Sequence, residues 1–418
     1  MTSRERVLQS LRHESTDRVP VDVGATRATG MHVSCVAKLR NHFGFSDRPV
    51  KVVEPRRMLG EIDAELIEAL GVDTAAIMPR RNIFGSLNER WKEWKMPGGQ
   101  VVEVPGDFNT TKDKRGTVYA HPEGDLEAPA SGRMPRTAHT FEIVPRREPV
   151  DEDSLDPEDN LEEFQPIGDD DIAYYERELR QASRLGRAVV ADFGGTSFGN
   201  TALVSAPFLK HPRGIRSMRE WHKSVRSRKD YVHQVFEKQV KTAMANLDKI
   251  SMKVGHFVDV VMVCDTDLAG QSSLLFPRDV IREMYMPYYQ RLNRWVHENT
   301  GWSTMKHTRG AVEPIIGDLI ECGFDIISPV QCSAANMDAG FLKNKYGDDI
   351  VFWGGGVDTQ ETLLSGKPRE IADRVARRCE TFSPNGGFVF GTVGVIQPNT
   401  PVANIVAMFE AAGDFNGG

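Results

Sequence analysis

The chain has 418 residues, 40% of them hydrophobic and 27% charged, and a net charge of −7. This length holds one large domain or two average ones. A negative balance without a basic run gives no reason to expect nucleic acid or an anionic membrane as a partner. The first residues form a charged amphipathic pattern unlike a signal peptide, and no apolar run is long enough to span a membrane. Its five scattered cysteines form no CxxC pair. We therefore expect a cytoplasmic protein with reduced thiols.

Short apolar segments alternate with amphipathic stretches along most of the chain, which predicts a parallel α/β fold. Eight strands are expected, near residues 19, 72, 188, 257, 303, 324, 350 and 387. Helices are expected at about 61–70, 172–184, 213–226, 227–254, 277–298, 312–320, 338–346, 361–380 and 402–412. Eight such units favour a closed (β/α)8 TIM-type barrel. A doubly wound open sheet is the alternative, although no GxGxxG motif follows the first strand.

The pattern changes between residues 82 and 147, after the second expected strand. Short β-like pieces at 101–104 and 116–121 alternate with turn residues, and 122–135 is irregular. We interpret residues 1–418 as a single barrel domain, with 82–147 as a β-rich insertion within it. The insertion either closes over the barrel or contacts a partner.

Polar residues follow many of the expected strands. The carboxyl ends of barrel strands meet at one mouth, so these side chains should converge there. They are Asp22, Arg27, Asp192, Asp265, Asp267, Gln271, His307, Arg309, Gln331, Asp358, Gln360 and Gln397. Each has a simpler interpretation: a strand-end aspartate can cap the next helix, and the glutamines or His307 can be hydrogen-bonded core residues. Their coincidence on one face favours a polar site around His307. No nucleophile elbow, P-loop, HExxH or paired-cysteine zinc motif is present.

Several longer motifs are familiar. They are DRVPV (17–21), FLKHPRGIR (208–216), DTDLAGQ (265–271), KHTRGAV (306–312), GFDIISPVQCSAANMD (323–338), FWGGGVDTQETL (352–363) and the stretch 386–411. Together they resemble the uroporphyrinogen decarboxylase superfamily, and within it the branch of corrinoid-dependent methyltransferases such as the methylcobalamin:coenzyme M methyltransferases. The resemblance covers nearly all of the chain, and it implies a (β/α)8 barrel with a site at the mouth.

The resemblance also implies a set of zinc ligands, which can be compared with the residues of this chain. Coenzyme M-type members hold zinc through a His-x-Cys pair and a later cysteine, and the zinc lowers the pKa of an acceptor thiol. Here His307 stands at the histidine, but Arg309 stands at the cysteine of the pair. Near the later ligand, Gly394 stands where close relatives carry a histidine. His307 is thus the remaining metal-ligand candidate, because Arg309 and Gly394 cannot bind zinc.

The decarboxylase proper binds substrate carboxylates through two arginines of an N-terminal motif. In the corresponding stretch, Arg27 and Gly30 are present, but Met31 stands in place of the second arginine. Tetrapyrrole carboxylates need several cationic partners, so true uroporphyrinogen decarboxylation is not expected.

The resemblance implies a methyltransferase that moves a methyl group between a small methylated (methoxy or similar) substrate and a cobalamin-type corrinoid. The expected partners are this small molecule, a separate corrinoid carrier protein, and a second copy of the chain in a homodimer. We expect catalytic roles for His307, Asp267 and Asp358, and substrate binding by Arg27, Arg309, Gln271, Gln331, Gln360 and Gln397. One alternative is a metal-free decarboxylase or lyase acting on an anionic substrate. Another is a binding protein whose chemistry has been lost.

Overall fold

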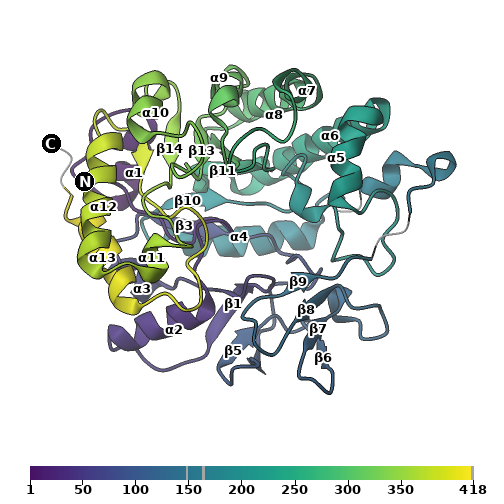
Figure 1. Cartoon of the computed structure of the whole chain (residues 1–418), viewed down its shortest axis with the longest axis horizontal. Helices are drawn as coiled ribbons and strands as arrows, with labels where there is room; N and C mark the ends of the chain where they lie inside the picture. Colours follow the sequence, from purple (N-terminus) through teal and green to yellow (C-terminus); the bar gives the residue numbers. More distant parts are fainter. Residues whose placement is uncertain (147–148, 162–164, 416–418) are drawn as a thin grey trace.

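A computed structural model describes residues 1–146, 149–161 and 165–415 (Figure 1). Seven strands form one parallel sheet in which neighbours in space are also neighbours in the barrel order. Across the sheet they are β15 (Phe388–Val389), β14 (Val351–Trp353), β13 (Ile326–Ser328), β12 (Ser303–His307), β11 (Val260–Asp265), β10 (Ala188–Ala191) and β3 (Thr74–Ile77).

The segment at residues 19–23 closes this sheet into a ring. The backbone N–H of Asp22 donates to the carbonyl of Phe390 at 2.8 Å, beyond β15. On the other side, the N–H of Asp73 donates to the carbonyl of Val21 at 2.8 Å, just before β3. The segment therefore lies between the two edge strands, and all eight segments fall where the sequence predicts strands. The predicted TIM-type barrel is confirmed.

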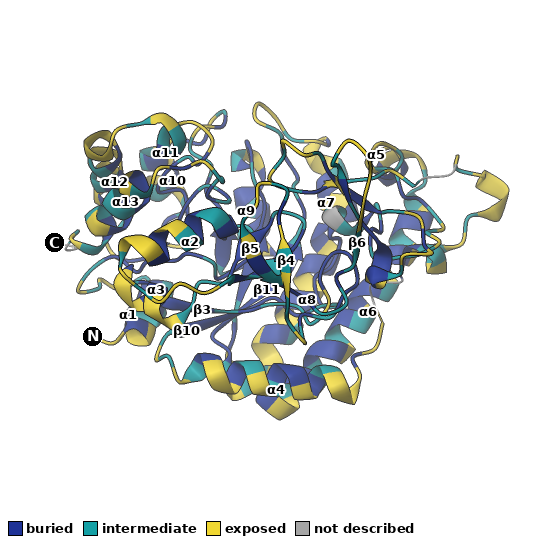
Figure 2. Ribbon diagram, turned by 90° about the horizontal axis from the view of Figure 1, so that it is seen from below, coloured by how far each residue is buried: buried dark blue, intermediate teal, exposed yellow. Residues whose placement is uncertain are grey.

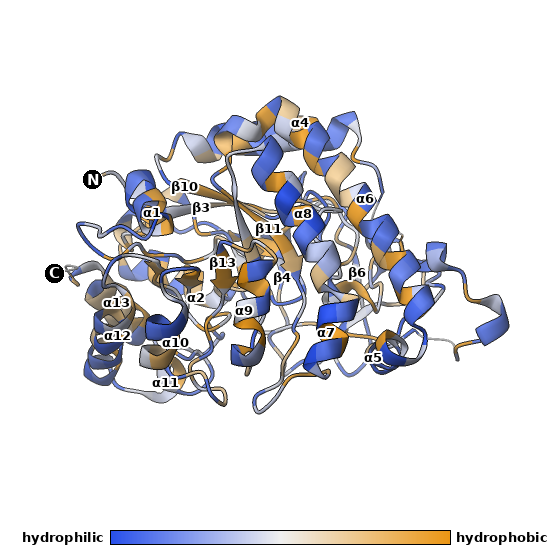
Figure 3. Ribbon diagram, turned by 90° about the horizontal axis from the view of Figure 1, so that it is seen from above, coloured by the Kyte–Doolittle hydropathy of each residue, from blue (hydrophilic) through white to orange (hydrophobic). Residues whose placement is uncertain are grey.

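Helices cover the outside of the barrel because each presents an apolar face to the strands. Those that connect or follow the barrel strands are α4 (Asp169–Ser183), α5 (Met218–Ser227), α6 (Lys229–Val254), α7 (Arg278–Met284), α8 (Met286–Asn299), α9 (Glu313–Glu321), α10 (Ala339–Tyr346), α11 (Thr362–Ser365), α12 (Pro368–Phe382) and α13 (Val402–Gly413). Figure 2 shows the exposed residues of α4 on its outer side, and Figure 3 shows hydrophobic strands β10, β11 and β13 inside the helical layer. No helix in the described ranges is long and apolar enough to cross a membrane.

Two helices expected to be continuous are divided. The stretch near 277–298 forms α7 and α8, with Pro287 in the first turn of α8. The stretch near 361–380 forms α11 and α12, with Pro368 opening the second helix. Proline has no backbone N–H and fixes φ, so it suits a first turn and interrupts a helix interior.

The barrel interior is a small apolar cluster, separate from the core between strands and helices. It consists of Val7, Ala25, Ala188, Val190, Val260, Met305, Ile326, Val351, Trp353 and Val389. Along each strand these residues alternate with outward-facing ones, as the period of two requires. Higher in the interior, Asp22 accepts hydrogen bonds from the Trp353 indole and the Thr74 hydroxyl, both at 2.8 Å. Burial raises the pKa of this carboxyl.

The N-terminal end of the barrel is closed by α1 (Ser3–Leu11). A capping box joins Thr2 and Glu5 at the start of this helix. Two of its arginines bind carboxylates at the bottom of the barrel: Arg4 pairs with Asp259 at 2.8 Å, and Arg6 pairs with the fully buried Asp73 at 2.7 Å. These pairs fix the helix under the strands and leave the opposite end for the site.

Two small antiparallel or mixed sheets lie beside the barrel, in the lower part of Figure 1. One has the order β2 (Leu59–Gly60), β1 (Val50–Glu54), β5 (Val101–Val104), β4 (Lys92–Lys95). The other has the order β6 (Thr110–Lys112), β7 (Val118–Ala120), β8 (Gly132–Met134), β9 (Glu142–Ile143). Phe84, Phe108 and Phe141 pack edge-on or tilted within this part, with ring centroids 5.7–6.0 Å apart.

The first of these sheets contains β1 and β2, which precede the second barrel strand and were not expected from the sequence. The pairing of β1 with β5 joins residues 50–51 to residues 102–103. The helix α2 (Val33–His42) leads into β1. The β-rich part is therefore assembled from two stretches of the chain, of which 82–147 is one. Short 3₁₀ helices occur at η1 (Pro122–Gly124), η2 (Glu152–Ser154), η3 (Pro157–Asn160), η4 (Thr201–Leu203) and η5 (Gly255–Phe257).

A candidate active site at the barrel mouth

Asp265 and His307 end neighbouring strands, β11 and β12, and are paired in the parallel register. The register shifts between Met262 and Cys264, so β11 contains one more residue than β12 here. This irregularity places Asp265, and not Cys264, opposite His307. The two side chains approach to 3.6 Å between Asp265 Oδ1 and His307 Nε2. Bulges often re-aim side chains beside active sites, and the carboxyl ends of barrel strands are where chemistry occurs in this architecture.

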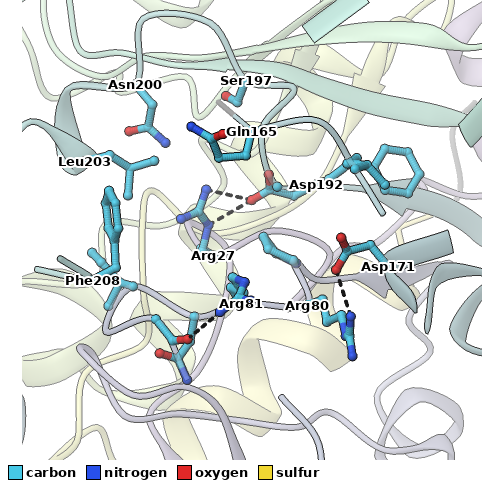
Figure 4. A pocket seen from close by; sticks show the side chains of 18 of the residues that line it. Arg27, Arg80, Arg81, Gln165, Asp171, Asp192, Ser197, Asn200, Leu203 and Phe208 are labelled. Carbon is cyan, nitrogen blue, oxygen red and sulfur yellow. Dashed lines mark hydrogen bonds and ion pairs between the residues drawn. The ribbon is translucent and has the colours of Figure 1, made fainter. Parts of the chain in front are cut away.

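Arg27 joins the end of β10 to the end of β11. Its Nη2 lies 2.7 Å from Asp192 Oδ2 and 3.7 Å from Asp265 Oδ2. Figure 4 shows the guanidinium directed at Asp192. Burial raises the pKa of Asp192 to about 6 although Arg27 opposes the shift. Burial also disfavours the charged form of Asp265, but His307 and Arg27 outweigh it and its pKa lies below the ordinary value. Arg27 therefore lies between the buried Asp192 and the partly exposed Asp265 at the centre of the mouth.

His307 is buried, with 5% of its surface exposed. Burial lowers its pKa to about 4, although the carboxylates of Asp265 and Asp267 favour the protonated ring. The imidazole is neutral near pH 7, with one N–H and one lone pair. Its Nδ1 has no hydrogen-bond partner within the described residues. Behind it, Lys306 Nζ donates to the carbonyls of Thr266 at 2.6 Å and His307 at 2.7 Å, which fixes the two strand ends together.

Arg309 and Asp267 form a second ion pair at the mouth. Asp267 accepts from the Arg309 backbone N–H at 2.9 Å and from Nη2 at 2.8 Å. Burial opposes ionisation of Asp267, but His307 and Arg309 outweigh it and lower the pKa to about 2. Asp267 is therefore ionised at any working pH and orients Arg309. Both arginines predicted to bind substrate, Arg27 and Arg309, are engaged by carboxylates of the chain.

The remaining predicted residues divide into three groups. Gln360 and Gln397 line a cavity with His307. Gln271 and Gln331 bond to each other, with Gln331 Nε2 2.8 Å from Gln271 Oε1, and line neither of the two mouth cavities. Asp358 accepts from the backbone N–H groups of Gln360 at 3.1 Å and Glu361 at 2.8 Å. It turns the loop after β14, which is the capping role that such an aspartate often has.

Two cavities open at this mouth. The smaller, of about 210 Å³, is bounded by His307 and Arg309, by Arg57, and by the loops after β14 and β15. Its full lining is Ala28, His32, Arg57, Thr140, His307, Arg309, Thr359, Gln360, Val393, Gly394, Val395, Gln397 and Pro398. Thr140 belongs to the 82–147 stretch, so this stretch contributes to the wall of the site. We call this space the His307 cavity.

The larger cavity, of about 430 Å³, lies on the other side of Arg27 (Figure 4). Arg27 and Asp192 form one wall, and Figure 4 shows Ser197, Asn200, Leu203 and Phe208 around the same space. Residues at 79–85, Glu123 and residues at 165–175 also line it. We call it the Asp192 cavity. Asp192 and Asp265 were among the strand-end residues noted in the sequence, but their shared arginine was not foreseeable.

Arg56 and Arg57 are the functional candidates that the sequence did not reveal. They follow β1, in a loop that no barrel argument places at the mouth. The Arg57 guanidinium donates to the carbonyl of Arg27 at 3.1 Å and pairs with no carboxylate in the described ranges. Burial lowers the pKa of Arg56, and the charges of Arg57 and Arg309 lower it further. The adjacent arginines after Pro55 are the signal that could have drawn attention to this loop.

The residues at the mouth do not fit the zinc site that the sequence resemblance implies. His307 is present, but Arg309 and Gly394 stand at the other ligand positions. Over the described residues, no group of three or more His, Cys, Asp and Glu side chains is arranged to hold a metal ion. Arg309 also places a permanent positive charge beside His307. We assign no step to a zinc ion.

An eight-stranded parallel barrel with buried charged pairs at the carboxyl ends of its strands defines a TIM-barrel protein of the enzyme type. The chain belongs to the uroporphyrinogen decarboxylase (URO-D) family, whose model matches residues 194–415. The matched part contains Asp265, Asp267, His307 and Arg309, so the family resemblance noted in the sequence is confirmed. Comparison with curated proteins gives no match.

Among solved structures, the chain is similar to a methyltransferase from Methanosarcina mazei, with a TM-score of 0.55 and 15% identity over 99% of both chains. Such a likeness shows a shared fold over the whole length. A D-psicose 3-epimerase aligns with 57% of this chain and 81% of its own at 9% identity, and the GH53 catalytic domain of Ignisphaera aggregans with 93% and 99% at 11% identity. Their TM-scores of 0.32 carry no argument.

Proposed function

We propose that this protein is a methyltransferase that moves a methyl group between a small methylated substrate and a corrinoid. Three findings support the proposal: membership of the URO-D family, motifs resembling the corrinoid-dependent branch, and a fold like that of the Methanosarcina methyltransferase. The observation that carries it is His307, a buried neutral imidazole on the wall of a small cavity at the barrel mouth, whose Nδ1 has no hydrogen-bond partner among the described residues.

The size of the His307 cavity limits what it can enclose. Small-molecule sites usually measure about 300–1,000 Å³, and this cavity measures about 210 Å³. It therefore suits a compact methyl donor, and we place the corrinoid macrocycle outside it, on a carrier protein. When bound, a corrinoid supplies the cobalt centre with which the methyl group is exchanged.

The residues of the His307 cavity have distinct roles in this proposal. When the bond between the methyl carbon and its oxygen or sulfur breaks, the heteroatom keeps the electron pair. The neutral imidazole of His307 can donate a hydrogen bond to that atom or accept one in the reverse direction. Asp265, 3.6 Å away, stabilises positive charge that develops on the ring. Arg57, whose side chain forms no ion pair within the described residues, is placed to bind an anionic group of the donor.

The test is methyl transfer with free cob(I)alamin and a set of methoxylated and methylthio carboxylic acids. The purified protein should form methylcobalamin with at least one donor, followed by its absorbance. His307→Ala should lower kcat/KM by about 10²–10⁴-fold, the usual contribution of a positioned acid or base. His256→Ala is the matched control, since His256 is exposed and lies outside the mouth. Complete inactivity with every donor, together with no corrinoid binding, would contradict the proposal.

A metal-free decarboxylase or lyase is the second candidate, and the crowding of arginines at the mouth favours it. Arg56 and Arg57 lie near Arg309. In the described part of the chain, Arg309 pairs with Asp267, whereas the side chains of Arg56 and Arg57 form no ion pair. Consumption of a methylated acid with release of CO2, in the absence of corrinoid, would select this candidate. Stoichiometric metal in the purified protein that disappears in His307→Ala would argue against it.

A further inference from the structure

The Asp192 cavity is a second space at the mouth that the proposed methyl transfer does not use. At about 430 Å³ it falls within the range of small-molecule binding sites. Its lining comes from five separate parts of the chain: Arg27, residues 79–85, Glu123, residues 165–175, and residues 192–209. Figure 4 shows these side chains turned toward a common space. A cavity built from such distant segments is a product of the tertiary fold.

The ionised side chains that line this cavity are already matched. Arg27 pairs with Asp192 at 2.7 Å, and Arg80 pairs with Asp171 at 3.0 Å. Arg81, at the exposed rim, lies 3.8 Å from Glu123. A charged ligand would have to break one of these pairs or remain uncompensated, and an unpaired charge in a poorly hydrated cavity is costly. The charge balance therefore selects an uncharged ligand.

The remaining lining combines apolar walls with a buried hydroxyl; over the described residues, this hydroxyl and Arg80 Nε are the buried lining atoms that lack a hydrogen-bond partner. Ile83, Leu203 and Phe208 supply apolar surface, and the buried Tyr175 packs edge-on against Phe193 with centroids 4.8 Å apart. Ser197 is 7% exposed, and its Oγ has no hydrogen-bond partner within the described ranges. A buried hydroxyl without a partner is uncommon in native proteins, because desolvation costs free energy that a hydrogen bond would offset. A ligand oxygen would satisfy it.

We propose that the Asp192 cavity is a binding site for an uncharged amphipathic molecule, with an aromatic or branched apolar body and one oxygen that bonds to Ser197. The apolar body lies between Leu203 and Phe208, and the oxygen lies at the end near Arg27 and Asp192. This site is separate from the His307 cavity, because the two cavities have no lining residue in common. The proposal does not depend on methyl transfer.

Binding of 4-methylphenol, toluene and 4-methylbenzoate, measured by saturation-transfer NMR and calorimetry at pH 7.5, tests it. The phenol should bind most tightly, toluene less tightly because it lacks the oxygen, and the benzoate least at this site. Leu203→Trp, which fills the cavity, should weaken phenol binding at least about tenfold. Ser197→Ala should weaken phenol binding about 2- to 10-fold, the effect of one hydrogen bond, and leave toluene unchanged.

The matched control is Arg48→Gln, at a half-exposed arginine that lines neither cavity, and it should leave phenol binding unchanged. Circular dichroism and thermal unfolding establish that each variant is folded, and Phe208→Ala provides a second, less bulky change, with weaker binding expected. Equal binding of phenol by Leu203→Trp, Phe208→Ala and wild type would overturn the proposal. So would tighter binding of the benzoate that is lost in Arg81→Gln, or no saturation transfer from any probe at millimolar concentration.

Discussion

The two cavities at the barrel mouth have no lining residue in common, and they differ in how their charges are balanced. On one side of Arg27, the Asp192 cavity contains arginines that each face a carboxylate. On the other side, the His307 cavity contains Arg57, which pairs with no carboxylate in the described ranges. The difference comes from the loops that cover each cavity, because the strand ends alone supply similar residues. A barrel mouth can therefore carry one space suited to neutral molecules and another suited to anions.

Removal of the Arg27 cation should have the largest effect on the free energy of unfolding. Arg27→Met leaves Asp192, which is 1% exposed, and Asp265 without their cation. Breaking a buried pair from one side typically costs about 3–5 kcal/mol, so urea unfolding should show a loss of this size. Arg48→Met is the control: Arg48 is 50% exposed and its pair with Asp63 should contribute less than about 1 kcal/mol. A loss of stability in Arg27→Met no larger than that in Arg48→Met would show that the ion pairs of Arg27 do not stabilise the fold.

His307 should make the protein less stable in acid. The pKa of His307 is lowered to about 4 in the folded protein, so the unfolded chain binds a proton more readily. The stabilisation is present above the unfolded value of about 6.5 and is lost as the pH falls towards 4, by about 3 kcal/mol in total. His307→Gln should flatten the acid limb of a pH series of unfolding free energies, whereas His256→Gln should not. Identical slopes for wild type and His307→Gln would contradict the buried neutral ring.

Asp192 should have the opposite effect on the pH dependence of stability. The pKa of Asp192 is raised to about 6 by burial, so the folded protein binds this proton more readily than the unfolded chain. Stability from this group increases as the pH falls from about 6 to 4, by about 3 kcal/mol. Asp192→Asn removes the gain, and the variant should lose more stability than wild type over this window. Asp169→Asn, at a fully exposed side chain, is the control. If Asp192→Asn lost less stability than wild type as the pH falls, Asp192 would not stabilise the folded protein in acid.

The smallest effect is expected at Arg57. A hydrogen bond to a charged group contributes about 1.5–3 kcal/mol, so Arg57→Gln should raise KM for an anionic donor about 10- to 150-fold with little change in kcat. Arg81→Gln changes the rim of the other cavity and should leave KM unaltered. An equal rise in KM for neutral and anionic donors would mean that Arg57 acts through the shape of the cavity and not through its charge.

Much of the barrel and part of the site could be predicted from the sequence. His307 was expected at the mouth because it ends an apolar strand and precedes an amphipathic helix, and both are local signals. The contact of Arg27 with Asp192 spans 165 positions, and no local pattern encodes such a pair. Asp358 is predicted to be catalytic, and the structure shows that it also accepts backbone N–H groups that turn a loop. A strand-end aspartate has the same local sequence signature in both roles, so the pattern could not separate them.

The sequence by itself determined the eight strand positions, the family and the strand-end residues around His307. These follow from periodicity, from turn residues and from motifs, all of which act over short distances along the chain. Only the tertiary structure decided which charges are matched. Arg27 and Arg309 are neutralised by distant aspartates, Arg57 comes to the mouth from a strand outside the barrel, and the space is divided in two. Charge balance and cavity shape depend on contacts between segments far apart in sequence, and folding alone brings these together.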